Sequence, residues 1–498
     1  MNNLLVYPVL IPFAAAAVCL LFRQRPAIQQ AISLVGSASH LIACGLLLQE
    51  VINKGIQVLF VGNWPAPFGI SLVADHLSVL MLSVTGILGT AAAVYARGEM
   101  SVSLRNQGFH PLFHILIGGL SGAFLTGDLF NLYVWFEVML IASFGLLMWG
   151  QRRAQFSGAV RYVVINLLAT LLFLLGLALL YGLTGTLNMA HLHQIIATHD
   201  AKGLLTAISF VFMAAFGIKA GMFPFFFWLP ASYHTPPVAI SALFAGMLTK
   251  VGVYALIRTF SLVFSHDIPA THSLLLLTAC LTMVTGVLGA AAQNEFRRVL
   301  SFHIISQVGY MILGLALWTP LALTGTVFYL VHHMIVKANL FLVSGLGRDI
   351  NGTMDLERMG DIYSKKPFVA ALFFIPAFSL AGFPPLSGFW AKLLLVQSSL
   401  QVQHYIVAAI AVIVGFLTVF SMVKIWLKAF WEPIKNPAPH NSNTSISLWK
   451  LVPVAVLGLI TLFIGIVAEP FYQLAVVAAE ELMAPGVYVQ TVLSGGTQ

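Results

Sequence analysis

The feature that most constrains this chain is a series of long apolar segments that follow one another with short polar loops between them. A helix needs about 20 consecutive apolar residues to cross the hydrocarbon core of a lipid bilayer. Because 59% of the residues are hydrophobic and only 8% are charged, no polar block is large enough for a soluble domain. We therefore expect an all-α polytopic membrane protein with about 14 transmembrane helices, near residues 3–22, 29–49, 77–96, 110–126, 128–149, 160–183, 203–223, 236–260, 271–292, 299–318, 322–346, 368–402, 405–430 and 449–472.

The positions of the basic residues support this set of spans. If the first span is uncleaved and the N-terminus lies outside, only Lys54, Lys202 and Arg258 fall on the outer side, and four lysines fall inside spans. The other seventeen of the 24 fall on the inner side, as the positive-inside rule requires: Arg23, Arg25, Arg97, Arg105, Arg152, Arg153, Arg161, Arg297, Arg298, Arg348, Arg358, Lys365, Lys366, Lys424, Lys428, Lys435 and Lys450. The net charge of +8 therefore reflects membrane topology, and we expect no nucleic acid partner.

Two parts of the chain resemble each other in sequence. TGTLNMAHL (184–192) is similar to NGTMDLERM (351–359), and the same offset of 167 residues aligns Asp128 with Glu295. This offset corresponds to an odd number of spans, so the two copies must have opposite orientations in the membrane. We therefore expect two inverted five-helix repeats. The expected parts are an N-terminal three-helix part (1–109), a first repeat (110–262), a second repeat (263–431) and a C-terminal helix and tail (432–498).

Each predicted repeat contains a span that is broken by proline. AGMFPFFFW (220–228) contains Pro224, and the similar AGFPPLSGFW (381–390) contains Pro384 and Pro385. A broken helix frees backbone groups, and within a membrane this is tolerated only beside other protein or a wet cavity. Broken helices at corresponding places in inverted repeats are typical of ion-coupled transporters.

Acidic residues are rare inside the spans, and only Glu137 lies near the middle of one. A carboxylate at that depth indicates a functional site, and the alternative is a structural ion pair or a protonated, hydrogen-bonded carboxyl. Asp75, Asp128 and Glu295 lie at span ends, where we expect hydrated surface residues. Because one carboxylate offers too few oxygens for a hard cation such as Na⁺, we expect protons to be the cargo of this chain.

Four lysines lie within the spans: Lys219, Lys250, Lys337 and Lys392. Lys219 precedes the first break and is the expected partner of Glu137. Burial disfavours a protonated amine and a nearby carboxylate favours it, so separating the two groups would release a proton. Lys250 lies too deep in its span to reach the interface. Lys392 follows the second break, and structural pairing or snorkelling is the alternative to a role in proton transfer.

Two adjacent histidines belong to the motif HHxxxK in the eleventh span. His333 and Lys337 are four residues apart and share one helical face, whereas His332 points about 100° away. Histidine suits proton transfer because its usual pKa lies near neutrality, although a lone histidine in a span is more often a satisfied core residue. We expect proton transfer through both histidines, with His303 as a weaker candidate, and we expect no metal and no cofactor.

These residues, taken in order, resemble a known family. A span with Glu137, a broken span with Lys219, a span with Lys250, the HHxxxK span and a broken span with Lys392 are similar to the antiporter-like membrane subunits. Such subunits occur in respiratory complex I, in membrane-bound hydrogenases and in Mrp-type multisubunit Na⁺/H⁺ antiporters. The length of 498 residues fits the D-type member of the Mrp antiporter better than its much longer A-type member. Lys392 also favours the Mrp type, because the most similar complex I subunit often has glutamate at that place.

The resemblance implies a proton-translocating subunit, rather than an enzyme, in a hetero-oligomeric Na⁺/H⁺ antiporter of the bacterial inner membrane. It implies other membrane subunits as partners, with the Glu137 side of the chain facing a neighbour. It also implies a hydrophilic axis along the membrane midplane that links Glu137, Lys219, Lys250, His333, Lys337 and Lys392. Two alternatives stay open: a proton-pumping subunit of complex I or of a membrane-bound hydrogenase, and a structural or assembly subunit whose buried charges merely pair.

Overall fold

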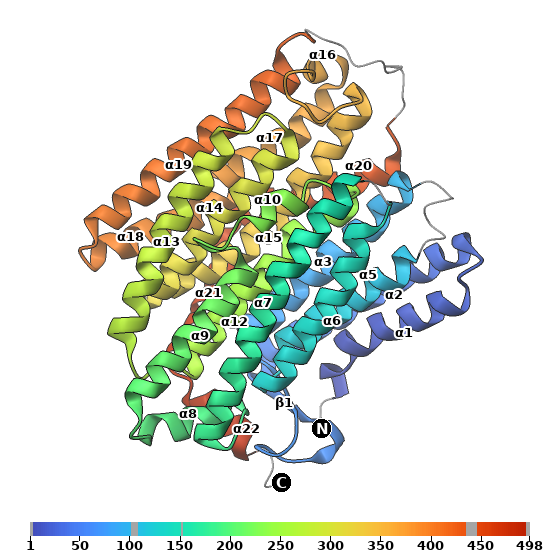
Figure 1. Cartoon of the computed structure of the whole chain (residues 1–498). Helices are drawn as coiled ribbons and strands as arrows, with labels where there is room; N and C mark the ends of the chain where they lie inside the picture. Colours follow the sequence, from blue (N-terminus) through green and yellow to red (C-terminus); the bar gives the residue numbers. More distant parts are fainter. Residues whose placement is uncertain (1–2, 101–107, 151–152, 435–445, 495–498) are drawn as a thin grey trace.

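The apolar segments fold into helices wherever a span was expected (Figure 1). The computed structural model describes residues 3–100, 108–150, 153–434 and 446–494. Within these residues, eleven helices are long and apolar enough to cross a membrane. Three shorter apolar helices, Tyr7–Leu21, Phe109–Leu125 and Pro367–Ala381, supply the rest of the expected set. The all-α polytopic membrane architecture is therefore confirmed.

The N-terminal part contains α1 (Tyr7–Leu21), α2 (Pro26–Lys54) and α3 (His76–Glu99). The first half then contains α5 (Phe109–Leu125), α6 (Leu129–Met148), α7 (Arg153–Thr184), α8 (Met189–Thr198), α9 (Lys202–Ala220), α10 (Trp228–Ser232), α11 (Val238–Leu243), a π-helical turn (Phe244–Leu248) and α12 (Thr249–Leu262). The second half contains α13 (Ile268–Ala291), α14 (Phe296–Leu317), α15 (Pro320–Asn351), α16 (Ile362–Lys365), α17 (Pro367–Ala381), α18 (Ser387–Gln401), α19 (Tyr405–Ile425) and a second π-helical turn (Trp426–Trp431). The chain ends with α20 (Leu448–Ile466), α21 (Ala468–Met483) and α22 (Gly486–Ser494).

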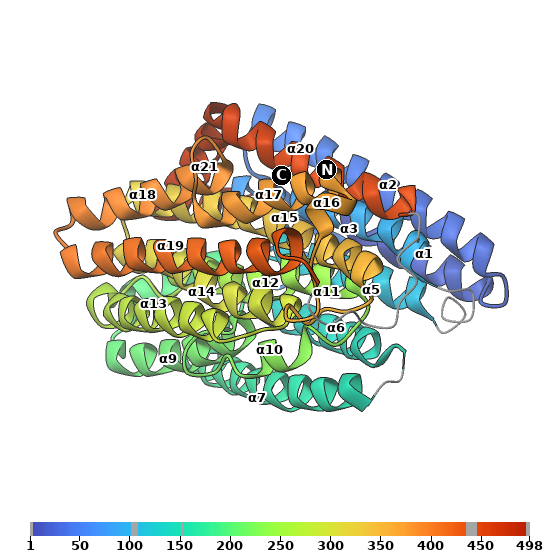
Figure 2. The ribbon, with the colours of Figure 1, turned by 90° about the horizontal axis from the view of Figure 1, so that it is seen from above.

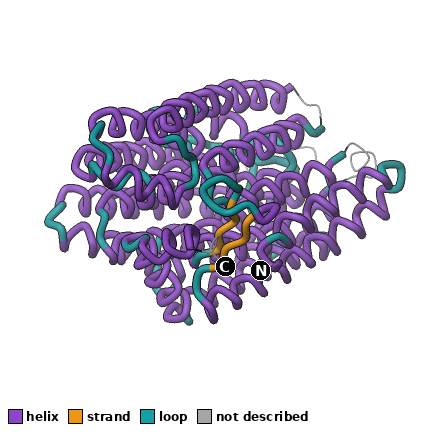
Figure 3. Tube along the Cα trace, turned by 90° about the horizontal axis from the view of Figure 1, so that it is seen from below, coloured by secondary structure: helices purple, strands orange, loops and turns teal. Residues whose placement is uncertain are grey.

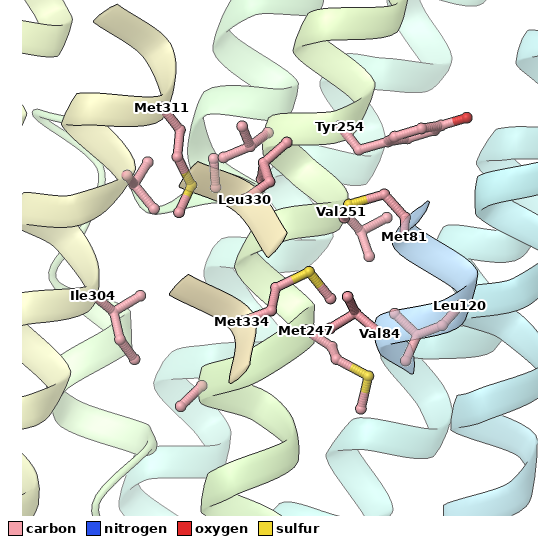
Figure 4. Packing of buried hydrophobic residues seen from close by; sticks show 14 of the residues in the cluster. Met81, Val84, Leu120, Met247, Val251, Tyr254, Ile304, Met311, Leu330 and Met334 are labelled. Carbon is pink, nitrogen blue, oxygen red and sulfur yellow. The ribbon is translucent and has the colours of Figure 1, made fainter. Parts of the chain in front are cut away.

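The helices pack side by side in layers (Figure 2). Helices α7 and α9 lie at one edge of the bundle, α2 and α20 lie at the opposite edge, and α12, α14 and α15 lie between them. These middle helices are almost entirely buried. Figure 4 shows apolar side chains such as Met81 of α3, Val251 of α12 and Met334 of α15 filling the space between them. The lysines of α12 and α15 are therefore surrounded by protein on all sides.

A small antiparallel hairpin, which the span pattern did not predict, lies at one end of the bundle. Strand β1 (Gln57–Phe60) pairs with β2 (Ser71–Ala74) so that Gln57 lies opposite Ala74. Figure 3 shows the two strands near both chain termini, and α8 lies at the same end of the bundle in Figure 1, whereas α16 lies at the opposite end. Two termini at one end are what an even number of spans requires.

The two halves are built alike, as the sequence repeat predicts. Helices α7 and α15 each have 32 residues, and their bounds differ by the same 167 residues. Asp128 caps the N-terminus of α6 and Glu295 caps that of α14, each accepting from a backbone N–H three residues on, at 2.8 and 2.6 Å. A β-bridge between Asp128 and Asn188 is matched by one between Glu295 and Asp355. The two acids are thus helix caps, and the expectation of merely hydrated surface residues was incomplete.

The two broken spans also match. Helix α9 is followed by Gly221 (φ 77°) and α17 by Gly382 (φ 93°), and both glycines have a left-handed conformation that favours glycine. The chain then passes through Pro224 in the first break, and through Pro384 and Pro385 in the second, before α10 and α18 begin. The predicted breaks therefore separate two helical pieces at corresponding places of the two halves.

The residues after α20 pack back against the bundle. Helix α21 contacts α3 and α15, and α22 contacts α8 and β1. The Glu481 carboxylate of α21 accepts hydrogen bonds from the backbone N–H of His76 at 3.1 Å and from its ring Nδ1 at 2.8 Å.

Three of the basic residues assigned to the inner side, Arg105, Arg152 and Lys435, lie outside the described residues.

Candidate functional site

The first pair of the predicted site is formed by α6 and α9. Lys219 is 6% exposed, and its Nζ donates a hydrogen bond to Thr170 Oγ1 of α7 at 3.2 Å. The same Nζ lies 4.8 Å from the centre of the Phe136 ring. Glu137 acts on Lys219 through its charge, but the two described side chains form no ion pair within 4.0 Å. The pair is therefore close but not locked together.

A small cavity adjoins Lys219. Its volume is about 20 Å³, which is room for about one water molecule. Asn166 and Tyr162 of α7 supply polar atoms to its wall, and Trp228 of α10 closes it from the side of the break. Trp228 Nε1 also donates to the carbonyl oxygen of Ile218 at 3.0 Å, which ties α10 to the last turn of α9.

Lys250 is fully buried in α12, directly after the π-helical turn. Its Nζ donates to the carbonyl oxygen of Ala245, which belongs to that turn. A π-helical turn bonds each carbonyl to a residue one position farther along than an α-helix does, and such turns frequently mark functional sites. A Cβ added at Gly252 would lie 2.5 Å from the backbone of α9 at Ala220, so α12 packs directly against the end of α9.

His333 and Lys337 lie on one face of α15, as their spacing predicts. Both are fully buried. In the part of the chain that the structure describes, neither the ring nitrogens of His333 nor the Nζ of Lys337 have a hydrogen-bond partner. The charges of Lys250 and Lys337 act on His333, and those of Lys250 and Lys392 act on Lys337. Lys337 is therefore within range of both Lys250 of the first half and Lys392 of the second half.

His332 faces the second break instead. Its Nδ1 lies 2.8 Å from Ser387 Oγ of α18, and Ser387 Oγ lies 3.0 Å from Ser379 Oγ of α17. The two adjacent histidines thus point toward different neighbours. His303 of α14 is also fully buried, and the charges of Lys337 and Lys392 act on it. The weaker relay candidate therefore lies beside the same lysines.

Lys392 reaches back across the second break. Its Nζ donates to the carbonyl oxygens of Leu380 at 2.9 Å and Ala381 at 3.1 Å, at the end of α17. Carbonyl groups at a helix C-terminus attract a cation. The sequence repeat aligns Leu380 with Lys219, so the two amines occupy related places although their residues do not align. Lys392 and Pro384 also line an apolar groove of about 460 Å³ beside α19.

The sequence prediction missed a buried ion pair between Asp75 and Arg258. Arg258 Nη1 and Nη2 donate to the two carboxylate oxygens of Asp75 at 2.5 and 2.8 Å. The side chains of Arg258 and Asp75 are only 5% and 3% exposed, so the expectation that Asp75 is a hydrated surface residue was wrong. Burial raises the pKa of Asp75, but the charge and hydrogen bonds of Arg258 lower it by a larger amount. The pKa of Asp75 therefore lies below its usual value. A local signal was present, because Asp75 and Ser78 form a capping box.

The chain is similar to known membrane subunits over its whole length. Residues 126–418 match the family model described as NADH:quinone oxidoreductase/Mrp antiporter, TM. The D subunit of the Na(+)/H(+) antiporter of Alkalihalophilus pseudofirmus is 45% identical, and that of Bacillus subtilis is 38% identical; both alignments cover 99% of this chain and 100% of the relative. A chain in the structure of an Mrp complex from Dietzia sp. DQ12-45-1b is 32% identical, with a TM-score of 0.91 and coverage of 99% and 100%.

Proposed function

The chain belongs to the NADH:quinone oxidoreductase/Mrp antiporter family of polytopic membrane proteins, and on that premise we propose that it is a proton-translocating subunit of a multisubunit Na⁺/H⁺ antiporter. Two relatives that are named as D subunits of Na(+)/H(+) antiporters, and the likeness to a chain of an Mrp complex, support this assignment. Other membrane subunits are then its partners, and protons and Na⁺ are the ions exchanged by the complex.

The observation that carries the proposal is the row of buried amines and imidazoles that leads from α9 to α18. Four lysines and the histidines of α14 and α15 lie inside the bundle, and Glu137 at one end is the acid that acts on the first of them. In a purely structural arrangement each buried cation would have an acid partner. Lys250, Lys337 and Lys392 have none among the described residues. Lysine and histidine side chains can lose their proton and become uncharged. Such groups fit a buried site without acid partners better than permanently charged groups do.

Glu137 and Lys219 act as the gating pair in this proposal. A carboxylate near Lys219 favours its protonated form, and moving that carboxylate away favours release of the proton. Because the two groups are not locked in an ion pair, a small displacement of α6 or α9 suffices to change their interaction. The cavity beside Lys219 has room for about one water molecule, which is what proton transfer to the next group requires.

Lys250, His333 and Lys337 pass the proton onward, and Lys392 exchanges it with one aqueous side. Lys337 lies within range of the charges of Lys250 and Lys392. Protonating one amine therefore disfavours a proton on the next, which moves protons along the row one group at a time. His332, joined to Ser387 across the second break, links α15 to the helix that carries Lys392.

Everted membrane vesicles that contain the whole complex test the assignment. We expect Glu137→Gln and Lys219→Ala each to abolish cation-dependent collapse of a pH gradient while the complex still assembles. Lys202→Ala is the matched control, because Lys202 lies at the surface end of the same helix and bonds only to nearby carbonyl oxygens. Antiport at the wild-type rate in an assembled Lys219→Ala complex would contradict the proposed role of this lysine.

A further inference from the structure

A second site lies away from the row of lysines, in a groove of about 430 Å³ beside the first helix break. Helix α10 contacts both α7 and α14 and forms the floor between them, and Figure 2 shows α10 between these neighbours. Gly158 of α7 permits the close approach, because an added Cβ would lie 2.8 Å from the Ala231 carbonyl oxygen. The groove is therefore a fixed feature of the packing and not a gap between mobile loops.

The groove carries positive charge without a neutralising acid. Arg161 of α7 and Arg298 of α14 line it, and both are exposed. Among the described residues neither guanidinium forms an ion pair with a carboxylate, and no acid lines the groove. Glu295, at the N-cap of α14, accepts instead from the backbone N–H of Arg298. Two arginines that face one groove from different helices are suited to bind a phosphate group.

His234, in the segment between α10 and α11, adds a polar atom to the same wall. Its Nδ1 is buried beside the Pro230 backbone. Burial and the positive charges of Arg298 and Arg297 lower the pKa of His234 to about 4. The neutral ring therefore lies in the positive potential of the two arginines.

The remaining wall is apolar. Phe227 is 70% exposed, and Phe302 and Pro230 lie beside it. Both arginines belong to the side of the membrane that carries most of the Lys and Arg residues. The groove thus combines a positive end with an apolar wall, and from the expected topology we place it where the headgroups and acyl chains of the inner leaflet meet.

We propose that this groove binds an anionic phospholipid, with its phosphate between Arg161 and Arg298 and an acyl chain along Phe227 and Phe302. A free phosphate ion would satisfy the arginines but leave the apolar wall uncovered. A zwitterionic lipid would cover the wall, but its own cation would oppose the two guanidinium groups. Only a lipid with a net negative headgroup matches both parts of the groove.

Lipid retention by the purified complex tests this site independently of ion transport. The complex is exposed to an equal mixture of phosphatidylglycerol and phosphatidylethanolamine, and bound lipid is counted by native mass spectrometry. We expect Arg161→Gln/Arg298→Gln to weaken phosphatidylglycerol binding by about 30-fold, the factor that two basic residues contribute at an anionic surface. Arg23→Gln/Arg25→Gln removes the same charge from an exposed loop on the same side and is expected to bind like the wild type.

Three outcomes would overturn the proposal. These are equal loss in both double variants, equal binding of phosphatidylethanolamine by the wild type, and complete displacement of lipid by inorganic phosphate. If the arginine variant does not assemble, photoactivatable phosphatidylglycerol added to the wild-type complex tests whether lipid binds in this groove. We expect cross-links to the peptide that contains Phe227, and cross-links confined to other parts of the chain would refute the site.

Discussion

Replacing Arg258 by methionine, which has a similar length and no charge, leaves Asp75 buried without its partner. The wild-type pair is bidentate and almost completely shielded from water. Breaking such a pair by removing one partner costs about 3–5 kcal/mol. Asp75 can escape part of that cost by binding a proton. Holding a carboxyl with a usual pKa near 4 in its neutral form at pH 7 costs about 4 kcal/mol, which agrees with the first figure.

The pH dependence of this loss follows from the direction of the two pKa shifts. In the wild type the pKa of Asp75 lies below its unfolded value, although burial raises it, because Arg258 outweighs burial. The pair therefore adds stability above about pH 4 and loses it as the pH falls. In Arg258→Met only the hydrogen bonds with Ser78 still oppose burial, so we expect the pKa of Asp75 to rise. The variant is then least stable at neutral and alkaline pH, and its deficit shrinks to about 1.5 kcal/mol at pH 5.

Thermal denaturation of the purified complex, with the unfolding of this chain followed at pH 7 and pH 5, measures the effect. A loss of about 4 kcal/mol lowers the midpoint of a chain of this length by about 4 °C. Arg258→Met/Asp75→Asn removes both charges and keeps a side-chain oxygen for the Ser78 N–H, so we expect it to recover most of the loss. A single variant as stable as the wild type at pH 7, or a double variant no better than the single one, would refute the reasoning.

Two further predictions concern the candidate site. Gly252→Ala places a Cβ 2.5 Å from the backbone of α9. We therefore expect a loss of about 1–3 kcal/mol in stability and slower antiport in vesicles. Gly45→Ala is the control, because a Cβ added there has no atom within 4 Å. Wild-type antiport by the first variant would contradict the close packing. Ser387→Ala removes the partner of His332, and we expect about threefold to tenfold slower antiport, the range for one lost hydrogen bond. Ser399→Ala is its control, because that buried hydroxyl bonds only within its own helix, and equal slowing by both would count against His332.

Most of the architecture could be predicted because it depends on local properties of the chain. The length of each apolar segment sets a span, and the prolines with a nearby glycine set each break. The face shared by His333 and Lys337 follows from a spacing of four residues. The repeat was visible because similar local segments, such as those around Asp128 and Glu295, recur at one offset and form matching caps in the structure.

The sequence alone determined that this chain is a polytopic membrane protein, where its spans lie and that four lysines are buried inside it. Hydropathy and helix-breaking residues are sufficient for that, because the bilayer demands internally bonded apolar helices. Only the tertiary structure decided which buried groups meet. It paired Asp75 with Arg258 across 183 positions and placed Lys392 on the carbonyl groups of α17. Such contacts depend on how distant helices pack, and no local pattern of residues records that packing.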